Sequence, residues 1–376
     1  MNLFNVYPRF PVSLSHGLGC YVYDKSNQPF LDLYGGHGVI SIGHSHPVFI
    51  NAITQQLSRI GFYSNTIEIP EQELLAGLLA RLSGYSDYQL FMCNSGTEAN
   101  ENALKLASFH NGKSKIIAFE NSFHGRTSAA LNVTDNPRIS APINQNNFKV
   151  VFTELNNKAQ FDKAIQAEEV CAVILEGIQG VGGLNEPKSD FLEHVARSCK
   201  RAGALLILDE IQSGYGRSGH FFAHQMSMVK PDIITMAKGM GNGFPLGGLL
   251  VTPHIDPWPG MLGSTFGGNY LACIAGIAVL ETIQQENLIG SARTVGTQLR
   301  DRLLEIPAIK TVKGRGLMLG LELDFPIKDL RHQLLFKHRI FTGASTNPNL
   351  LRILPPLNIS MDDLGVFIDA LQLEIK

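Results

Sequence analysis

The sequence predicts an α/β protein with a large domain built on a mainly parallel sheet and a smaller α+β domain. Three observations support this fold class. Short apolar runs rich in Ile, Val and Leu recur through the middle of the chain. A helical stretch separates two of these runs, and the last part of the chain has a different, mixed pattern.

The apolar runs are continuous, which is typical of strands covered on both faces of a sheet. Strand, helix and strand in this order predict parallel pairing with right-handed crossovers. The runs lie at residues 115–119, 149–152, 171–176, 204–210, 232–238 and 247–251.

Residues 189–203 supply the helical stretch between the third and fourth runs. Asp190 is a candidate N-terminal cap, and Gly203 can end the helix. A single apolar stripe predicts burial of one helix face against the sheet. The stripe comprises Phe191, Leu192, Val195 and Cys199.

The C-terminal part begins with a long helical segment at about residues 269–286. Strand-like segments follow at 316–324 and 350–357, and a closing helix starts at Met361. A chain of 376 residues exceeds the usual size of a single core. We therefore expect three parts: an N-terminal segment (1–50) that joins the small domain, a large domain (51–265), and a linking helix with the small domain (266–376).

The composition excludes several classes of function. A net charge of −2 provides no field that would attract nucleic acid or anionic lipid. The five cysteines form no Cys-x-x-Cys pair, which favours reduced thiols. The N-terminal residues contain neither a basic start nor a sustained apolar stretch, so we expect a cytoplasmic protein without a signal peptide.

Two charged residues stand at the ends of predicted strands, where open parallel sheets bind ligands. Asp209 follows the last apolar residue of one run, and Lys238 ends another. One interpretation is that they pair with each other or with surface groups. The other is that a cofactor lies between them, with an aldehyde facing the amine and a basic ring nitrogen facing the carboxylate. A desolvated lysine in cationic surroundings loses its proton and becomes the nucleophile that Schiff-base chemistry requires.

Residues 94–107 suggest a phosphate site. Ser95, Gly96 and Thr97 carry donors and precede a helical segment, and backbone amides at a helix start attract anions. The alternative is an ordinary N-cap with Glu98 in the first turn.

Other phosphate and metal motifs are incomplete. Residues 238–248 contain G-x-G-x-G, but they lack the strand–turn–helix context of a dinucleotide fingerprint. His37, His44 and His46 are close in sequence, but no Cys, Asp or Glu nearby completes a ligand set. We therefore expect neither a nicotinamide oxidoreductase nor a metal site.

Together, eight segments resemble the class III aminotransferases, in the right order along nearly the whole chain. The resemblance implies the aspartate aminotransferase fold (pyridoxal-phosphate fold type I), with seven strands in the main sheet. The segments lie at 30–47, 94–107, 123–127, 174–183, 206–219, 236–248, 263–269 and 351–357.

The resemblance also implies pyridoxal 5'-phosphate as cofactor. Lys238 would form the Schiff base and move the substrate proton, and Asp209 would charge the ring nitrogen. Thr265 would reach the phosphate of the neighbouring subunit, which implies a homodimer with shared active sites. The other cofactor residues would be Ser95, Gly96 and Thr97 at the phosphate, Phe123 stacked on the ring, Gln212 near its phenolic oxygen, and His124.

The substrates implied are small amino acids and keto acids. Arg352 would bind the α-carboxylate and Arg126 the distal carboxylate of glutamate or 2-oxoglutarate, because a guanidinium binds carboxylates bidentately. Glu176 and Ser264 would complete the substrate site. The segment matches of the N-terminal part favour acetylornithine or succinylornithine aminotransferases of arginine biosynthesis.

One segment departs from the family pattern. Residues 176–183 read EGIQGVGG where relatives commonly have EPIQGEGG, so Gly177 replaces proline and Val181 replaces a glutamate that masks Arg352. Val181 cannot mask a charge, which would favour reaction at the α-carbon for both substrates. Because the reacting amine of acylated ornithine is the δ-amine, we interpret the departure as an altered substrate fit.

Three alternatives remain. An ω-aminotransferase acting on ornithine or 4-aminobutyrate would share the cofactor, as would an aminomutase, which needs no keto-acid acceptor. A non-catalytic binding protein would have no use for Lys238.

Overall fold

The structure, a computed structural model, describes residues 1–144, 148–166 and 169–375. Its largest sheet has seven strands in the order β4-β10-β9-β8-β7-β5-β6. Strands β6, β5, β7, β8 and β9 run parallel to one another, whereas β10 is antiparallel to both β9 and β4. The predicted α/β fold with a mainly parallel seven-stranded sheet is confirmed. The strands are β4 (Gln89–Cys93), β5 (Lys115–Phe119), β6 (Val150–Thr153), β7 (Val170–Glu176), β8 (Leu205–Asp209), β9 (Ile233–Met236) and β10 (Gly247–Val251).

Helices cover both faces of this sheet, which explains the continuous apolar runs. On β5, Ile116 and Ala118 belong to the apolar cluster on the face of α4 (Gly96–Asn111). Ile117 and Phe119 point to the other face, where α6 (Lys158–Ile165) and α7 (Ser189–Ala202) pack. Successive side chains of a strand alternate between faces, so every residue of β5 is buried.

Helix α7 starts one residue earlier than its predicted cap. Lys188 is the N-cap and makes no side-chain capping bond, so the expectation that Asp190 caps the helix was wrong. The Asp190 carboxylate lies in the first turn and pairs with Lys158 Nζ at 2.6 Å, across to α6. Gly203 ends the helix in the left-handed conformation, as predicted.

Strand β4 has no counterpart among the predicted runs. It lies at the edge of the sheet, and only Cys93 at its end is fully buried. A partly covered edge strand does not require a continuous apolar sequence.

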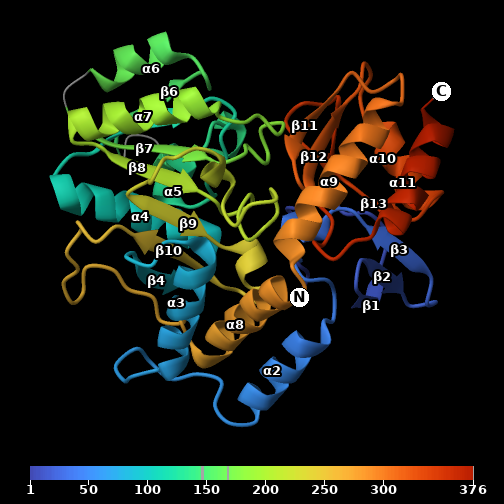
Figure 1. The fold of residues 1–376 in the computed structure, drawn as a ribbon, viewed down its shortest axis with the longest axis horizontal. Helices are drawn as coiled ribbons and strands as arrows, with labels where there is room; N and C mark the ends of the chain where they lie inside the picture. The colour runs from blue at the N-terminus through green and yellow to red at the C-terminus, as the bar shows by residue number, and fades with distance from the viewer. Residues whose placement is uncertain (145–147, 167–168, 376) are drawn as a thin grey trace.

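The remaining strands form two four-stranded sheets (Figure 1). In the first, Ile340 pairs in parallel with Leu31, which joins the N-terminal strands to the C-terminal part. Its members are β1 (Leu14–Leu18), β2 (Tyr21–Asp24), β3 (Pro29–Asp32) and β13 (Ile340–Phe341). The second contains β11 (Thr311–Arg315), β12 (Met318–Glu322), β14 (Gly343–Ala344) and β15 (Leu350–Ile353).

Long helices connect and cover these parts. Helix α8 packs against both α2 and α3, below the large sheet in Figure 1. Asn269 caps α8 by accepting a hydrogen bond from Ala272 N, close to the predicted start. These helices are α2 (Pro47–Leu57), α3 (Pro70–Ser83), α8 (Tyr270–Gln285), α9 (Leu288–Leu304), α10 (Lys328–Phe336) and α11 (Met361–Glu374). Shorter helical elements are α1 (Gly35–Gly38), α5 (Ser128–Asn132), and the 3₁₀ turns η1 (Pro137–Ile139), η2 (Pro142–Asn144), η3 (Ala223–Met226) and η4 (Lys238–Met240).

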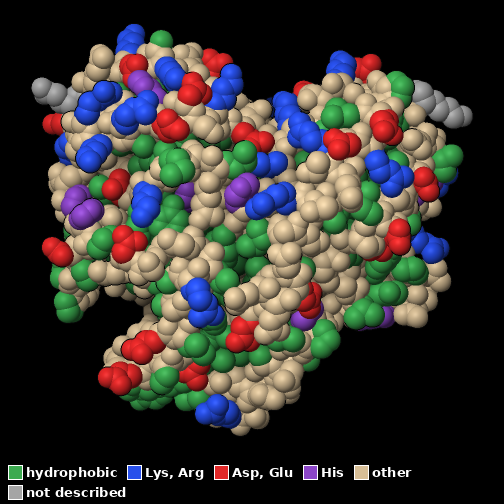
Figure 2. All heavy atoms as spheres, viewed as in Figure 1, with side chains coloured by type: hydrophobic (Ala, Val, Ile, Leu, Met, Phe, Trp, Pro, Cys, Tyr) green, Lys and Arg blue, Asp and Glu red, His purple; other side chains and the backbone are tan. Residues whose placement is uncertain are grey.

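Charged side chains of both signs are mixed over the face shown in Figure 2. Within the described residues, no helix has the length and apolar character needed to cross a membrane.

Two helical glycines allow a matched test of the packing of α9 against the C-terminal sheet. A Cβ atom on Gly296 would lie 2.1 Å from the carbonyl oxygen of Gly316, whereas one on Gly365 of α11 would meet nothing within 4 Å. We expect Gly296→Ala to destabilise the fold by about 1–3 kcal/mol through overpacking. Gly365→Ala should stabilise it by about 0.5–1 kcal/mol through helix propensity. Thermal unfolding followed by circular dichroism measures both, and equal midpoints would contradict this packing.

Candidate active site

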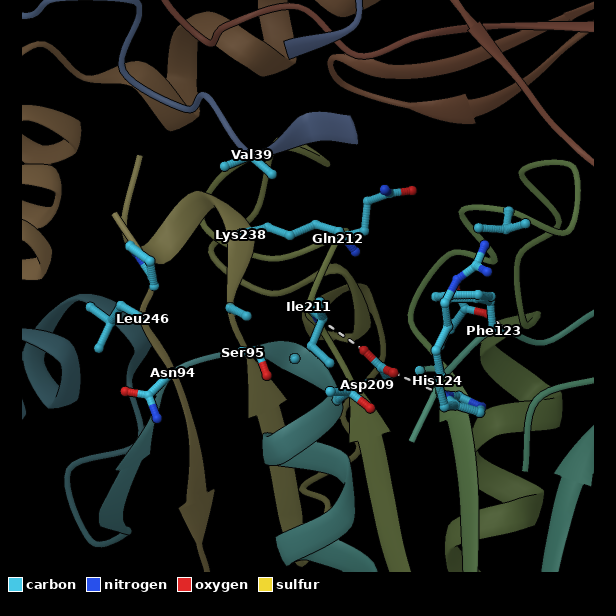
Figure 3. A pocket seen from close by; sticks show the side chains of 18 of the residues that line it. Val39, Asn94, Ser95, Phe123, His124, Asp209, Ile211, Gln212, Lys238 and Leu246 are labelled. Carbon is cyan, nitrogen blue, oxygen red and sulfur yellow. Dashed lines mark hydrogen bonds and ion pairs between the residues drawn. The ribbon is translucent and has the colours of Figure 1, made fainter. Parts of the chain in front are cut away.

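A cavity of about 410 Å³ lies at the carboxyl edge of the large sheet. Strands β7 and β8 end there at Glu176 and Asp209, and the chain passes from β9 into η4 at Lys238 (Figure 3). Most of the predicted site residues line this cavity. They are Ser95, Gly96, Thr97, Phe123, His124, Arg126, Glu176, Asp209, Gln212 and Lys238.

Lys238 begins η4 directly after β9 and has a left-handed backbone, with φ of +47°. Such a conformation costs about 1–3 kcal/mol in a non-glycine residue and is concentrated at functional sites. Burial lowers the pKa of the Lys238 amine, and the carboxylates of Asp209 and Glu176 oppose this shift. A lowered pKa increases the fraction of neutral, nucleophilic amine.

The carboxylate of Asp209 is buried and held by three hydrogen-bond donors. Oδ2 accepts from His124 Nδ1 at 2.7 Å and from Asn100 Nδ2 at 2.8 Å. Oδ1 accepts from the backbone N–H of Ile211 at 3.0 Å. A carboxylate has about four acceptor positions, so it can still accept a bond from a protonated ring nitrogen in the cavity. His124 Nε2 is buried and has no partner among the described residues.

The start of α4 forms one wall of the cavity. Ser95 is the N-cap, and its hydroxyl accepts from Glu98 N at 3.3 Å. A Cβ atom on Gly96 would lie 2.8 Å from Ile211 Cγ2, so only glycine fits there without displacing Ile211. The ordinary capping interaction is therefore present, and the same helix start opens on a cavity where its amides can bind an anion.

Glu176 holds two backbone groups at the site. Its Oε1 accepts from Phe123 N at 2.9 Å, and its Oε2 accepts from Gly180 N at 2.8 Å. Burial raises the pKa of this carboxyl group, and nearby His124 opposes the shift. The bond to Phe123 fixes the backbone of the residue expected to stack on the cofactor ring.

Arg352, on β15, lies beside the cavity rather than among its lining residues. Its Nη1 donates to the carbonyl of Gly180 at 2.7 Å and to Gln212 Oε1 at 3.3 Å. Its Nε is buried without a partner in the described part of the chain. Gln212 Nε2 in turn donates to the carbonyl of His37 at 2.8 Å.

The two predicted residues of segment 263–269 lie outside the cavity. Thr265 is exposed. Ser264 Oγ accepts from Asn94 Nδ2 at 3.0 Å, and Asn94 lines the cavity.

The three histidines considered for a metal have separate surroundings. His44 Nε2 bonds to Asp32 at 2.8 Å, His46 Nε2 bonds to Glu286 at 3.0 Å, and the His37 ring packs on Tyr34. In the described ranges, no group of three or more His, Cys, Asp or Glu side chains is placed to hold a metal ion.

The comparisons with known proteins identify the family. The family model described as aminotransferase class-III matches residues 5–375. The chain belongs to the class III aminotransferases.

Curated class III relatives match over the full length. An acetylornithine aminotransferase of Aquifex aeolicus is 40% identical, with 98% of each chain covered. Acetylornithine aminotransferase 1 of Bordetella pertussis is 39% identical, with 100% of this chain and 97% of that protein covered. Among solved structures, the ornithine aminotransferase of Toxoplasma gondii has a TM-score of 0.91 at 28% identity, covering 98% of this chain and 92% of that one.

This class III enzyme is a pyridoxal-phosphate-dependent aminotransferase. Its residues fit that cofactor: a lysine whose pKa is lowered, a hydrogen-bonded carboxylate and a helix start whose amides can bind an anion lie around one cavity. When bound, pyridoxal phosphate supplies an aldehyde for amines and a ring that withdraws electrons from the reacting carbon.

Glu210, next to Asp209, holds the segment after β8 in place through hydrogen bonds to its carboxylate. Its carboxylate accepts from His224 Nδ1 at 2.7 Å and from Ser213 Oγ at 2.6 Å, in a fully buried environment. Burial alone would raise the pKa of Glu210, but the bonds from His224 and Ser213 outweigh it and hold the pKa below its ordinary value.

This lowered pKa predicts an acid-sensitive contribution to stability. The Glu210 carboxylate stabilises the fold above its unfolded pKa of about 4.3, and the contribution is lost as pH falls through the lower folded pKa. Glu210→Gln should reduce stability at pH 7 by about 3 kcal/mol, because it breaks a buried pair. It should also flatten the loss of stability below pH 4. Thermal unfolding across pH measures this, with the exposed Glu193→Gln as the control expected to change stability by less than about 0.5 kcal/mol. Parallel curves for Glu210→Gln and the native enzyme would contradict it.

Proposed function

We propose that the enzyme transfers the amino group between an N-acylated ornithine, either acetyl or succinyl, and 2-oxoglutarate, as a step of arginine biosynthesis. The observation that carries this proposal is the full-length similarity to acetylornithine aminotransferases at 37–40% identity. The retention of Lys238 and Asp209 on one cavity supports catalysis rather than binding alone.

Lys238 is the proposed catalytic residue. Its amine would hold the cofactor between reactions and, once displaced by the substrate amine, would carry the proton away from the reacting carbon. General acid–base transfer of this kind is worth about 10²–10⁴-fold. The lowered pKa of Lys238 supports this role, because the displaced amine must be neutral to accept a proton.

The cofactor itself would be held at three points. Asp209 would accept a hydrogen bond from the ring nitrogen, and Phe123 would stack on the ring beside His124. The start of α4, with Ser95, Gly96 and Thr97, would bind the phosphate. Gln212 would lie near the phenolic oxygen.

Two arginines would bind substrate carboxylates. Arg352 is buried, its Nε has no partner among the residues that the structure describes, and the oxygens of Gly180 and Gln212 that accept from its Nη1 are uncharged. A buried guanidinium without a carboxylate partner favours an anionic ligand. Arg126 is exposed at the cavity, where it can receive the distal carboxylate. Glu176 and Ser264 would contribute to this substrate side through the backbone of Gly180 and through Asn94.

Val181 also lines the cavity, adjacent in sequence to Gly180. No carboxylate from this position competes for Arg352. We infer that the arginine is available to substrate in both half-reactions, so the pocket differs from that of relatives with glutamate here. Gly177 donates its N–H to the carbonyl of Asp209 at 3.2 Å, a bond that proline could not make.

The proposal includes a homodimer with shared active sites. It also places the enzyme in the cytoplasm. Large apolar side chains are exposed on α2, α3 and the adjoining loops, over the lower part of Figure 2. Exposed apolar side chains that gather on one part of a protein surface are typical of protein interfaces. They include Val48, Ile50, Leu57, Ile60, Phe62, Tyr63, Leu74 and Phe266. Thr265, next to Phe266, would then reach the phosphate of the partner subunit.

A second candidate is transamination of free ornithine. The TM-score of 0.91 to an ornithine aminotransferase favours it among ω-aminotransferases. An aminomutase is distinguished by its independence of a keto-acid acceptor.

An assay with three donors tests the proposed substrate. We expect kcat/KM with acetylornithine or succinylornithine, in the presence of 2-oxoglutarate, to exceed that with ornithine by about tenfold or more, equivalent to 1.4 kcal/mol. The physical reason is that free ornithine brings an α-ammonium group near the two arginines. Chromatographic quantification of glutamate measures turnover, and Lys238→Ala is the control expected to lose at least about 10²-fold. Faster reaction of free ornithine, or turnover without 2-oxoglutarate, would overturn the assignment.

The role of the uncharged residue at position 181 can be tested with two substitutions that differ from each other only in charge. Val181→Glu should raise KM for 2-oxoglutarate by about tenfold, because the new carboxylate can pair with Arg352 and must be displaced. Val181→Gln has nearly the same size without the charge, and its KM should stay within about threefold of the native value. Steady-state kinetics measure both. If the two variants raised KM equally, size rather than charge would explain the effect.

A further inference from the structure

Asn100 is a buried polar residue in the second turn of α4, with no exposed surface. Asparagine is a poor helix former, and an amide taken out of water is unfavourable unless it is hydrogen bonded. Asn100 lies four residues after Gly96, so both are on the same face of the helix. That face is directed towards the ends of the central strands.

The hydrogen bonds of the Asn100 side chain join α4 to other parts of the chain. Nδ2 donates to Asp209 Oδ2 at 2.8 Å and to the carbonyl of His124 at 2.7 Å. Oδ1 accepts from Thr235 Oγ1 at 2.8 Å. Both amide hydrogens are therefore used on acceptors, and the amide oxygen is used on a donor.

The Asp209 carboxylate and the His124 carbonyl select this orientation of the amide. A flipped amide would point its oxygen at the Asp209 carboxylate and at the carbonyl of His124, both of which are acceptors. The Thr235 hydroxyl, on β9 and with no exposed surface, supplies a donor on the opposite side. The three bonds are satisfied together in only one orientation.

His124 depends on the same amide. Its carbonyl accepts from Asn100, and its Nδ1 bonds to the same oxygen of Asp209 that Asn100 contacts. Asn100 thus fixes both the carboxylate and the backbone of the residue that shares it. The beginning of the same helix borders the part of the cavity expected to hold the phosphate.

We propose that Asn100, held at its amide oxygen by Thr235, is a positioning residue that fixes the Asp209 carboxylate against the ring nitrogen of the cofactor. This inference rests on the proposed role of Asp209. It assigns to α4 two connected tasks, phosphate binding at its first turn and carboxylate alignment at its second.

The test uses holoenzyme variants and two measurements besides activity. These are the dissociation constant for pyridoxal phosphate and the pH at which its visible absorption band changes. Asn100→Leu removes all three bonds at nearly constant volume, and we expect it to weaken cofactor binding by about 10–100-fold, in the range of lost hydrogen bonds to a charged group. The pH of the spectral change should shift, and kcat should fall by more than KM changes.

Thr235→Val removes only the hydroxyl that donates to the Asn100 amide oxygen, and we expect about 3–10-fold weaker cofactor binding. Thr235→Ser keeps the hydroxyl and should restore binding to within about twofold. Thr153→Val is the matched control: Thr153 also lies on a strand of the sheet and is buried, but its hydroxyl has no partner among the described residues. It should bind the cofactor as the native enzyme does.

A double variant, Asn100→Leu with Thr235→Val, separates a shared role from two independent ones. Because both changes disrupt one arrangement, the double variant should be little weaker than Asn100→Leu alone. If the losses of cofactor affinity in the two single variants multiplied in the double variant, the proposal would be overturned. A Thr235→Val enzyme indistinguishable from Thr153→Val would also overturn it, a result that stands even if Asn100→Leu fails to fold. If the native enzyme itself showed no visible cofactor band, the proposed function would fail instead.

Discussion

The active site depends on holding one carboxylate in a fixed orientation inside the protein. Asp209 is nearly fully buried, and an uncompensated buried charge is unfavourable by several kcal/mol, roughly. Its donors come from α4, from the loop after β5 and from the chain that follows β8 itself. These segments meet at one point because β5, β7, β8 and β9 are parallel, so their carboxyl ends lie along the same edge of the sheet. The parallel arrangement of these strands is therefore what brings the three donors to the Asp209 carboxylate.

The Lys238 turn depends on the N-terminal segment in a similar way. The left-handed backbone of Lys238 is followed by a second non-glycine left-handed residue, Asn242. The Asn242 side chain accepts from the N–H groups of Ser41 and Ile42 and donates to the carbonyl of Gly43, while Ser41 Oγ donates to the carbonyl of Gly239. These four bonds tie residues 41–43 to residues 239–242. An unfavourable local conformation persists where surrounding contacts determine it, and here those contacts come from the far end of the chain.

Features that depend on local sequence could be predicted, and features that depend on distant contacts could not. The ends of β8 and β9 are visible as charged residues after apolar runs, and the start of α4 is visible as small polar residues before a helix. The partners of Arg352 were not predictable, because Gly180 and Gln212 lie 172 and 140 residues away. Asn100 was inside a recognised segment, but its pairing with Thr235 spans 135 residues. A buried asparagine on the apolar face of a helix was the one local signal of that contact.

The charges around the cavity suggest how one site can accept chemically different substrates. The carboxylates, Asp209 and Glu176, are already occupied by donors from the protein. The cationic groups are less occupied: Nη1 of Arg352 donates to uncharged oxygens of Gly180 and Gln212, Arg126 is exposed, and position 181 carries valine rather than an acid. Under the proposed function, a substrate would therefore meet available positive charge and carboxylates that are already hydrogen bonded to the protein. This asymmetry selects for carboxylates and against additional ammonium groups, whichever amine reacts. Under the proposed function, an acetyl and a succinyl group would differ at this site by one carboxylate, which is the kind of group that the exposed Arg126 can bind.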